Sequence, residues 1–470
     1  MDDQRRNPSC IYLVYVNVYT QSRGPVPQKF YQSTYPGVLS PSLCQTDLST
    51  TLIQSKMRAA EGGDTSRELA FLKRCFDQYY RSSKVIPPYR FTRREWGFFP
   101  FGGKMMFRHI AFQRKEELDS FFRDSAPMHA YYSVAYYGDP GLQPMGEKFR
   151  TWMGADLIFD LDADHLPDAD KMTYPEQLAQ VKEEVKRLLF EFILGDLGLP
   201  EEHTHLHFSG GRGYHIHVRS PEVLNMDSRD RRQIVDYITG RNLDFDVLFP
   251  WMITDVNSRF GSVKKKRDFR SREHGGWITK VYRGKDDLIK DLGRFEKKKE
   301  RIKRLLEISR MKDLDIKEKK CESIIDDLFY SGKGNTARRM LDEDKFSLTS
   351  SKAMDNDFLK LSASYSSVNL SGETDEPVTT DIKRLIRCPG SLHGKTGLKV
   401  VEIEKDENII DEFDPLRDAV VLPSDEIDVE LIDDFHMEMG GSLWNLNKGK
   451  NRVPRYLAYF LVARRLALIS

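Results

Sequence analysis

The sequence predicts a mixed α/β protein, and three observations lead to that prediction. The chain has 470 residues, of which 39% are hydrophobic and 31% charged, so it can bury a sizeable core and exceeds one small domain. Apolar side chains recur at helical spacing over 175–197. Over 157–162 and 204–218 they instead run together or alternate, as they do in strands.

Composition excludes two classes of protein and favours one compartment. The apolar content rules out wholesale disorder, and no stretch reaches the 18 or so uninterrupted apolar residues of a membrane span. The 5 cysteines lie far apart without a C-x-x-C pair: Cys10, Cys44, Cys75, Cys321 and Cys388. A disulfide framework or a four-cysteine zinc site is therefore not expected, and we expect the reducing cytoplasm.

The net charge of +1 conceals local segregation. Residues 264–304 carry 17 Lys/Arg against 7 Asp/Glu, whereas residues 401–434 carry 14 acidic against 2 basic side chains. A basic segment of this kind can bind a polyanion, but charge alone favours the simpler explanation of solvated helix and loop faces.

The N-terminal residues differ from the rest of the chain. Residues 1–56 are rich in Ser, Thr, Gln, Pro and Tyr, with no helical periodicity and no signal-peptide pattern. They predict a poorly ordered extension that can be deleted without loss of stability. A helix is expected after Met57, with Leu69, Leu72 and Phe76 on its buried face.

The next elements follow from alternation and capping signals. Aromatic and glycine residues alternate over 91–112, as in a hairpin or two short strands. A long helix over 175–197 is indicated by a capping box of Thr173 and Glu176, with Gly198 as its stop. Its apolar stripe marks it as scaffold.

The second half of the chain divides by composition. The charged, helical pattern of 285–346 predicts an inserted helical subdomain, and the Ser/Asn/Gly-rich stretch 347–371 predicts a surface loop. We expect the α/β core to comprise 57–284 and 372–470.

The first chemical motif is ADLIFDLDADH. In a strand, Asp160 and Asp162 share one face, and two adjacent carboxylates repel each other unless a cation lies between them. Oxygen ligands of this type suit Mg²⁺ or Mn²⁺. The alternative is a strand end whose acids meet solvent.

The second motif, HLHFSGGRGYHIHV, reads as strand, glycine-rich turn and strand. Its glycines let backbone amides face an anion, and Ser209 and Arg212 add a hydroxyl and a charged fork suited to phosphate. His215 and His217 share the face of the turn. A zinc or iron site built from the H-x-H pairs and a plain hairpin are the competing interpretations.

The third motif, ETDEPVTTDIKRLIRCPGSLHGKTG, begins with Asp375. We expect a short basic helix capped by Thr379 or Thr380, with Arg387 near its end, followed by a loop that carries His393 and Lys395. Cations beside one acid suit a metal-bound polyphosphate. A basic surface helix is the simpler alternative.

Together the three motifs resemble the catalytic small subunit of archaeal and eukaryotic DNA primases, most closely the archaeal branch. The resemblance also covers REWGFFPFGGKMMFRHIAF and extends from about Glu68 to the C-terminal helix. It implies a primase-type α/β catalytic core with a helical insertion. The implied reaction is template-directed joining of nucleotides that starts a primer without a pre-existing 3′ end.

The resemblance also implies residue roles. Asp160, Asp162 and Asp375 would hold two Mg²⁺ or Mn²⁺ ions. The residues that match nucleotide-binding positions are Ser209, Arg212, His215, Arg387 and His393, together with Arg108 and Lys395. A large primase subunit, single-stranded DNA template, primer, and NTPs or dNTPs are the implied partners.

The sequence departs from the family pattern in two respects, and two other functions compete with the primase interpretation. Family members often carry a small zinc knuckle near the first motif, but no cysteine lies between Cys75 and Cys321, so we predict no structural zinc. The family pattern has no counterpart of residues 1–56. The rivals are a related primase-polymerase of DNA repair or end-joining and a non-catalytic nucleic-acid-binding module; the intact acids disfavour the latter.

Overall fold

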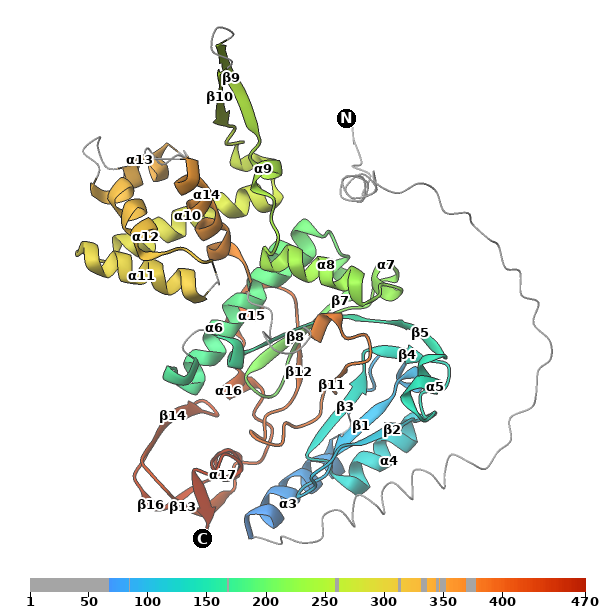
Figure 1. The fold of residues 1–470 in the computed structure, drawn as a ribbon. Coiled ribbons are helices and arrows are strands. Elements are labelled where there is room, and N and C mark those ends of the chain that lie inside the picture. The colour runs from blue at the N-terminus through green and yellow to red at the C-terminus, as the bar shows by residue number, and fades with distance from the viewer. Residues whose placement is uncertain are drawn as a thin grey trace, which may run out of the picture. The chain divides into compact units, whose positions relative to one another are not determined.

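The computed structural model describes most of the chain after residue 66. The described ranges are 67–83, 85–166, 169–257, 262–311, 314–330, 336–343, 346, 352–368 and 378–470. The predicted extension over 1–56 lies outside them. These ranges contain both helices and strands, so the predicted mixed α/β class is confirmed (Figure 1).

The first sheet is antiparallel, with the strand order β11-β3-β1-β2. Its strands are β1 (Trp96–Phe99), β2 (Phe107–Ile110), β3 (His129–Ser133) and β11 (Leu385–Arg387). Trp96 and Phe98 are fully buried against Phe122, which lies on helix α4 (Lys115–Ser125). Burial of each such ring contributes about 1.5–3 kcal/mol, and the aromatic alternation that predicted this hairpin is what fills its core.

Helix α3 (Arg67–Ser82) completes this aromatic core. Its Phe76 contacts Phe101 and also stacks on Tyr459 of helix α17 (Arg455–Ala463), with ring centroids 5.2 Å apart. The predicted N-terminal helix and the last helix of the chain therefore share one core.

The second sheet carries the first two motifs. Its antiparallel order is β12-β7-β8-β6, from β6 (Leu157–Asp162), β7 (Thr204–Phe208), β8 (Gly213–Val218) and β12 (Val401–Ile403). The strand, turn and strand predicted over HLHFSGGRGYHIHV are thus confirmed. Phe159 and Ile216 lie opposite each other on the apolar face and are completely buried.

Helix α6 (Tyr174–Lys186) and its π-helical continuation η4 (Arg187–Asp196) form the predicted long helix. The capping box of Thr173 and Glu176 is present, and Gly198 has the positive φ of 58° that ends such a helix. The predicted stripe is buried, including Val181, Val185 and others. The helix packs on β6 and β8.

Shorter elements connect these layers. Strands β4 (Ala135–Tyr137) and β5 (Trp152–Ala155) pair with each other. The remaining connecting helices of the described core are α5 (Met145–Phe149), α7 (Pro221–Leu224), α8 (Ser228–Thr239), α15 (Glu407–Glu412) and α16 (Pro415–Asp418), with short turns η1 (Phe91–Arg93), η2 (Ala163–His165), η3 (Ala169–Lys171), η5 (Glu201–His203) and η8 (Val378–Thr380).

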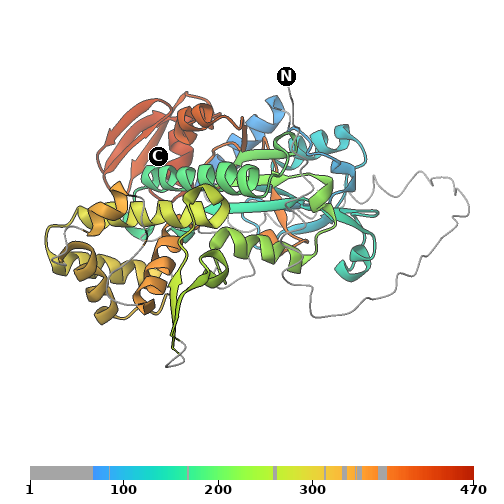
Figure 2. The same cartoon turned by 90° about the horizontal axis from the view of Figure 1, so that it is seen from above.

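The helical region is longer than predicted. Its elements are α10 (Gly276–Gly293), α11 (Lys298–Met311), α12 (Glu318–Ile325), η7 (Asp326–Tyr330), α13 (Thr336–Asp342) and α14 (Lys352–Ser366). They group together in Figure 2. The predicted bounds of 285–346 therefore cut through α10 and leave out α14. Before them, α9 (Phe245–Leu248) leads into the ribbon β9 (Trp251–Asn257) and β10 (Ser262–Arg267), and η6 (Arg272–His274) precedes α10.

The surface loop predicted over 347–371 is wrong for Lys352–Ser366, which form α14. Its small polar residues are contact residues on a buried helix face. Ser362 is fully buried, and Ser366 Oγ donates a hydrogen bond to the Lys280 carbonyl of α10 at 2.7 Å. A Cβ atom on Gly284 of α10 would lie 1.9 Å from the Ser362 carbonyl oxygen. The absence of a side chain at Gly284 is what lets the two helices approach so closely.

The C-terminal part contains a further sheet and a hairpin. The sheet order is β16-β13-β17, from β13 (Glu426–Leu431), β16 (Gly449–Pro454) and β17 (Ala467–Ile469), and the hairpin is β14 (Phe435–Met439) with β15 (Ser442–Leu446). Helix α17 lies between β16 and β17 in the chain and packs on both α3 and β13.

The short basic helix predicted after Thr380 is wrong. Only η8 is helical there, and Leu385–Arg387 form strand β11, which pairs with β3. Arg384 also accepts a backbone hydrogen bond from Val134. The helix does not form because this segment has a pairing partner some 250 residues earlier in the chain. The edge of β3 supplies hydrogen bonds to the backbone of Leu385–Arg387, which therefore adopts a strand.

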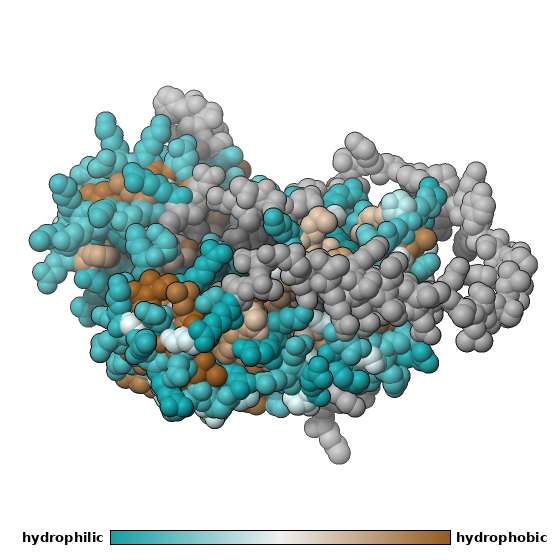
Figure 3. Space-filling view, turned by 90° about the horizontal axis from the view of Figure 1, so that it is seen from below, coloured by the Kyte–Doolittle hydropathy of each residue, from teal (hydrophilic) through white to brown (hydrophobic). Residues whose placement is uncertain are grey.

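The outer surface agrees with the composition. On the face shown in Figure 3, described residues are mostly hydrophilic, with smaller hydrophobic areas between them. No helix in the described ranges is long and apolar enough to cross a membrane.

Candidate nucleotide-binding site

The three motifs meet at one cavity of about 600 Å³. Its walls come from β3, from β6 with the turn that follows it, from the glycine turn between β7 and β8, from β11 with its following loop, and from the end of α17. The lining residues are Tyr131, Asp160, Asp162, Asp164, Ser209, Gly211, Arg212, His215, Arg384–Arg387, His393, Lys395, Thr396 and Ala463–Arg465.

The two acids of the first motif lie side by side at the end of β6. Asp160 is opposite His215 in the register of β6 and β8, and Asp162 is opposite Gly213. His215 Nε2 lies 3.3 Å from Asp160 Oδ1. A Cβ atom on Gly213 would lie 2.2 Å from the Leu161 carbonyl oxygen, so glycine is needed for β8 to approach β6 beside these acids.

The electrostatic environments of the two carboxyl groups differ. Burial raises the pKa of Asp160, but His215 and the guanidinium groups of Arg384 and Arg387 overcome this, so its pKa is below the usual value. The pKa of Asp162 is raised by burial and by the negative charges of Asp160 and Asp164, although the Asp164 amide donates to Asp162. Crowded acids of this kind gain from a cation bound between them.

The glycine turn is held by Ser209. Its Oγ accepts hydrogen bonds from the backbone amides of Gly211 and Gly213, each at 3.3 Å. These two amides therefore do not face the cavity as free donors, which corrects that part of the prediction. Because the hydroxyl oxygen accepts twice, its proton remains the group that Ser209 can offer to a ligand.

Arg212 and Tyr174 fix the outer side of the turn. The Arg212 guanidinium forms an ion pair with Asp164, and the Tyr174 hydroxyl donates to the Gly211 carbonyl at 2.6 Å. Thr396 Oγ1 donates to the Gly210 carbonyl at 2.6 Å, which links the turn to the loop of the third motif.

The third motif supplies a strand and a loop instead of a helix. Arg387 lies over the Tyr131 ring, 5.0 Å from its centroid, and its Nη1 is 2.8 Å from Nδ1 of His129. The rings of His129 and His393 are 5.1 Å apart. Burial, together with Arg387 and Lys395, lowers the pKa of His129 to about 3, and burial with Arg387 lowers that of His393 well below its usual value. Both imidazoles are therefore neutral near pH 7.

Several cations that line the cavity have no carboxylate partner within the described residues. They are Arg384, Lys395, Arg464 and Arg465, all exposed to solvent. Arg387 also contacts only aromatic and imidazole groups there. Cations that outnumber the carboxylates of the cavity favour binding of an anion.

Two predicted site residues are not brought together with the rest. Arg108 lies on β2 away from the cavity lining, and its Nε pairs with the buried Glu95 at 3.0 Å. Asp375 falls outside the described residues, so its proposed metal ligation is not tested. Within those residues, no group of three His, Cys, Asp or Glu side chains is arranged to hold a metal ion.

Sequence reasoning missed five residues of this site. His129 and Tyr131 lie on β3, Arg384 precedes β11, and Arg464 and Arg465 end α17. Arg384 stood within a quoted motif. His129 and Tyr131 carry no local signal, because only the tertiary fold brings Tyr131 to the cavity and His129 against Arg387. The paired arginines at the end of the last helix were the one feature that could have raised the question.

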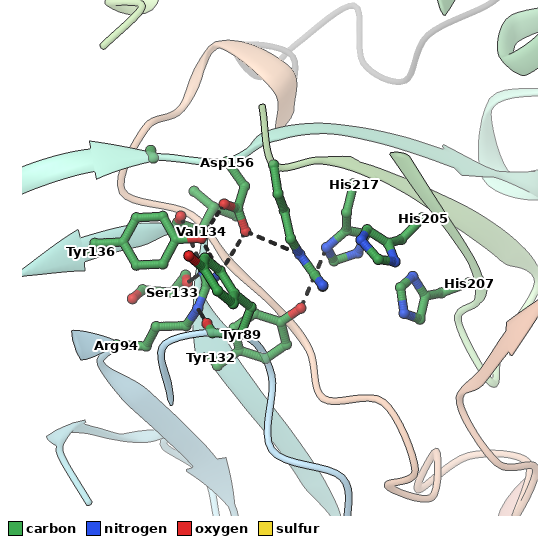
Figure 4. Close-up of polar contacts among 12 residues, drawn as sticks. Tyr89, Arg94, Tyr132, Ser133, Val134, Tyr136, Asp156, His205, His207 and His217 are labelled. Carbon is green, nitrogen blue, oxygen red and sulfur yellow. Dashed lines mark hydrogen bonds and ion pairs between the residues drawn. The ribbon is translucent and has the colours of Figure 1, made fainter. Parts of the chain in front are cut away.

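Behind the site lies a buried polar cluster, shown in Figure 4. Arg94 pairs with Asp156 at 2.7 Å, and the Tyr132 hydroxyl lies 3.4 Å from His217 Nδ1. Burial lowers the pKa of His207 to about 3 and that of His217 well below its usual value. Neutral, closely packed imidazoles at this depth explain His207 and His217 as internal packing, whereas His215 faces the cavity.

The basic segment 264–304 is largely balanced by acids in the folded chain. Examples are Arg283 with Glu191 and Arg304 with Asp291, the latter at 2.8 Å. Lys298 contacts Asp326 at 2.9 Å. These pairs favour the solvated-face explanation for much of the segment over a continuous polyanion-binding surface.

Adjacent carboxylates facing excess cations are typical of sites that transfer phosphoryl or nucleotidyl groups. Residues 159–404 match the sequence pattern of the family described as "DNA primase small subunit". The chain is also similar to proteins named DNA primase small subunit PriS. That of Methanocella arvoryzae is 36% identical over 84% of this chain and 97% of the relative, and that of Picrophilus torridus is 37% identical over 83% and 95%.

The PriS protein of Methanosarcina barkeri is likewise 37% identical, over 86% of this chain and 97% of its own. The chain therefore belongs to the DNA primase small-subunit family, in its archaeal form. The resemblance first recognised from three short motifs thus extends over most of the sequence.

Proposed function

We propose that this chain is the catalytic subunit of a DNA primase that synthesises short primers de novo on single-stranded DNA during replication. The observation that carries the proposal is the meeting of Asp160 and Asp162 with cations that lack carboxylate partners in one cavity. A binding-only protein has no need to place two crowded acids beside a polyanion site. The names of the relatives favour the replicative subunit over a repair or end-joining enzyme.

The acids fit a hard divalent cation. Asp160 and Asp162 present carboxylate oxygens on one strand face. The pKa of Asp162 is raised by burial and by neighbouring negative charge, and a cation would offset that charge. Mg²⁺ or Mn²⁺ would be held by Asp160, Asp162 and Asp375. Two such ions would stabilise the attacking and leaving oxygens of an in-line displacement.

The chain's own groups would bind and orient the nucleotide. Arg387 and Lys395 would neutralise the triphosphate, and Arg387 is well suited because Tyr131 and His129 fix its guanidinium. Ser209 and the neutral His393 would donate hydrogen bonds to phosphate oxygens. Their work is positioning and electrostatic stabilisation, which dominate catalysis of this reaction.

The proposal includes partners and a compartment. A large primase subunit is implied by the small-subunit family, and single-stranded DNA template and NTPs or dNTPs are the proposed substrates. The cytoplasm is the proposed location. The absence of a structural zinc site stays a prediction.

The direct test is synthesis on single-stranded DNA without a pre-existing primer, with labelled NTPs or dNTPs. The full chain should be assayed alone and with its large subunit, in Mg²⁺ and in Mn²⁺. Products that appear with wild type and vanish with the double variant Asp160→Asn/Asp162→Asn would support the proposal. Products that persist in a folded double variant would refute it.

A further inference from the structure

We propose that Arg464 and Arg465, at the end of α17, form a phosphate-binding subsite on the wall of the cavity beside the glycine turn. The inference rests on the proposed function for its ligand. Both residues lie beyond the 159–404 segment matched by the family pattern, yet both line the cavity. Their chemistry suits a phosphate oxyanion, either of a nucleotide triphosphate or of a nucleic-acid backbone.

Arg464 and Arg465 carry positive charge that no nearby acid in the described ranges balances. Neither Arg464 nor Arg465 has a carboxylate within ion-pair distance among the residues that the structure describes. By contrast Arg455, at the start of the same helix, pairs with Asp425. Cations near a helix C-terminus can simply stabilise the helix dipole, but that role does not require them to face a cavity shared with Arg212.

Arg464 is also held in place. Its guanidinium carbon lies 4.8 Å from the Tyr174 ring centroid and 5.1 Å from that of Phe460. Tyr174 in turn donates its hydroxyl hydrogen bond to Gly211 in the glycine turn. Stacking of this kind lowers the entropy lost when the guanidinium binds a ligand.

The φ of Arg465 is 60°, the left-handed conformation that ends many helices, where glycine is the usual residue. An arginine at this position is less favourable than glycine for the isolated helix end. The end of the helix therefore does not itself account for a long charged side chain at this position.

The left-handed backbone conformation of Arg465 makes Arg465→Gly a suitable test variant. Arg465→Gly removes the charge while relaxing the helix end, so its melting temperature should equal or exceed that of wild type. Arg464→Gln keeps part of the side chain that packs on Tyr174, and Arg465→Lys keeps the charge. Matched controls are Lys450→Ala, which removes an exposed cation on β16, and Asn242→Gly, which relaxes another residue with positive φ (59°).

The experiment measures two affinities for the full chain. One is for ATP in the presence of Mg²⁺, and the other is for an oligonucleotide of about 20 thymidines without nucleotide, by fluorescence anisotropy at fixed low salt. We expect Arg464→Gln and Arg465→Gly each to weaken at least one affinity about fivefold or more, as expected for loss of a charge-assisted contact. Arg465→Lys should recover most of it, and both controls should stay within about twofold.

The affinity that changes identifies the source of the phosphate. A loss confined to ATP assigns the subsite to the triphosphate, and a loss confined to DNA assigns it to the strand backbone. If wild type binds both ligands and the arginine variants match it, the subsite is wrong and the proposed function stands. If wild type binds neither, the proposed function is wrong and the subsite falls with it.

Discussion

His215 and Asp160 face each other across β8 and β6, with Nε2 of the imidazole 3.3 Å from Oδ1 of the carboxylate. One residue comes from the glycine-turn motif and the other from the acidic motif. Their contact joins the acidic motif to the glycine-turn motif, so the two motifs line one cavity.

Replacing Asp160 or Asp162 by Asn should abolish synthesis while leaving the fold intact. Both side chains are partly exposed to the cavity, so the isosteric amide costs little packing. Loss of a metal-binding carboxylate should lower the rate by at least about 100-fold. Primer synthesis and circular dichroism measure the two effects, and a variant that retains a tenth of wild-type activity would contradict the assignment.

Replacing Asp375 by Ala should likewise abolish synthesis, with Asp381→Ala as the control. Asp381 follows the turn η8 and is not in a helix. Its carboxylate instead accepts a hydrogen bond from the Lys383 amide at 2.8 Å, a local turn worth about 0.5–1.5 kcal/mol. Asp381→Ala should keep most activity. Near wild-type synthesis by folded Asp375→Ala would remove the third carboxylate from the site.

The Tyr174→Phe variant should show how far the glycine turn depends on its hydrogen bond from α6. It removes only the hydroxyl that donates to the Gly211 carbonyl, and it keeps the ring beneath Arg464. We expect a loss of about 0.5–1.5 kcal/mol in the free energy of unfolding and a raised nucleotide KM with little change in kcat. Steady-state kinetics and urea unfolding test this, and an unchanged KM would show that the turn is held without Tyr174.

Acid should destabilise the protein through its buried histidines. The folded pKa values of His129 and His207 are about 3, and an unfolded histidine titrates near 6.5. Between these values the unfolded state binds more protons, so stability is full above about pH 6.5 and falls as the pH decreases. Each such histidine should cost about 2 kcal/mol between pH 7 and pH 5.

The His207→Gln variant tests this prediction. Its stability should fall less steeply between pH 7 and pH 5 than that of wild type, whatever its absolute stability. His436→Gln, at an exposed position on β14, should leave the slope unchanged. Denaturant unfolding at several pH values gives the slopes, and parallel curves for His207→Gln and wild type would contradict the burial argument.

The close approach of α10 and α14 gives a matched pair of glycine variants. Gly284→Ala would place a Cβ atom 1.9 Å from the Ser362 carbonyl oxygen and should destabilise the helical region by about 1–3 kcal/mol. Gly293→Ala, on the same helix, meets no atom within 4 Å and should be neutral or slightly stabilising. Thermal unfolding compares them, and equal melting temperatures would show that α14 does not pack as described.

Capping residues and apolar alternation correctly predicted the helices and strands whose conformation depends mainly on neighbouring residues. The capping box of Thr173 and Glu176 fixed the start of α6, and alternation placed Asp160 and Asp162 on one face of β6. The same reasoning failed for β11 and α14. Arg384–Arg387 have the composition of a basic helix, but their backbone partners lie on β3, and Ser362 suits a loop until α10 covers it.

The candidate site divides in the same way. Ser209, Arg212, His215, Arg387 and His393 were placed together by their motifs, and the fold brings them to one cavity. His129 and Arg465 could not be found from sequence, because no spacing relates them to the motifs. Arg108 was expected nearby but instead balances the buried charge of Glu95.

The wide separation of the cavity walls along the chain has a consequence for synthesis of the protein itself. The lining residues extend from Tyr131 to Arg465, and α17 is anchored by the Tyr459 hydroxyl, which donates to the Gly394 carbonyl at 2.8 Å. A growing chain therefore carries both acidic and glycine-turn motifs long before their cavity is complete. Only after the last helix leaves the ribosome can the site close, so an incomplete chain lacks one wall of the cavity and should bind nucleotide poorly.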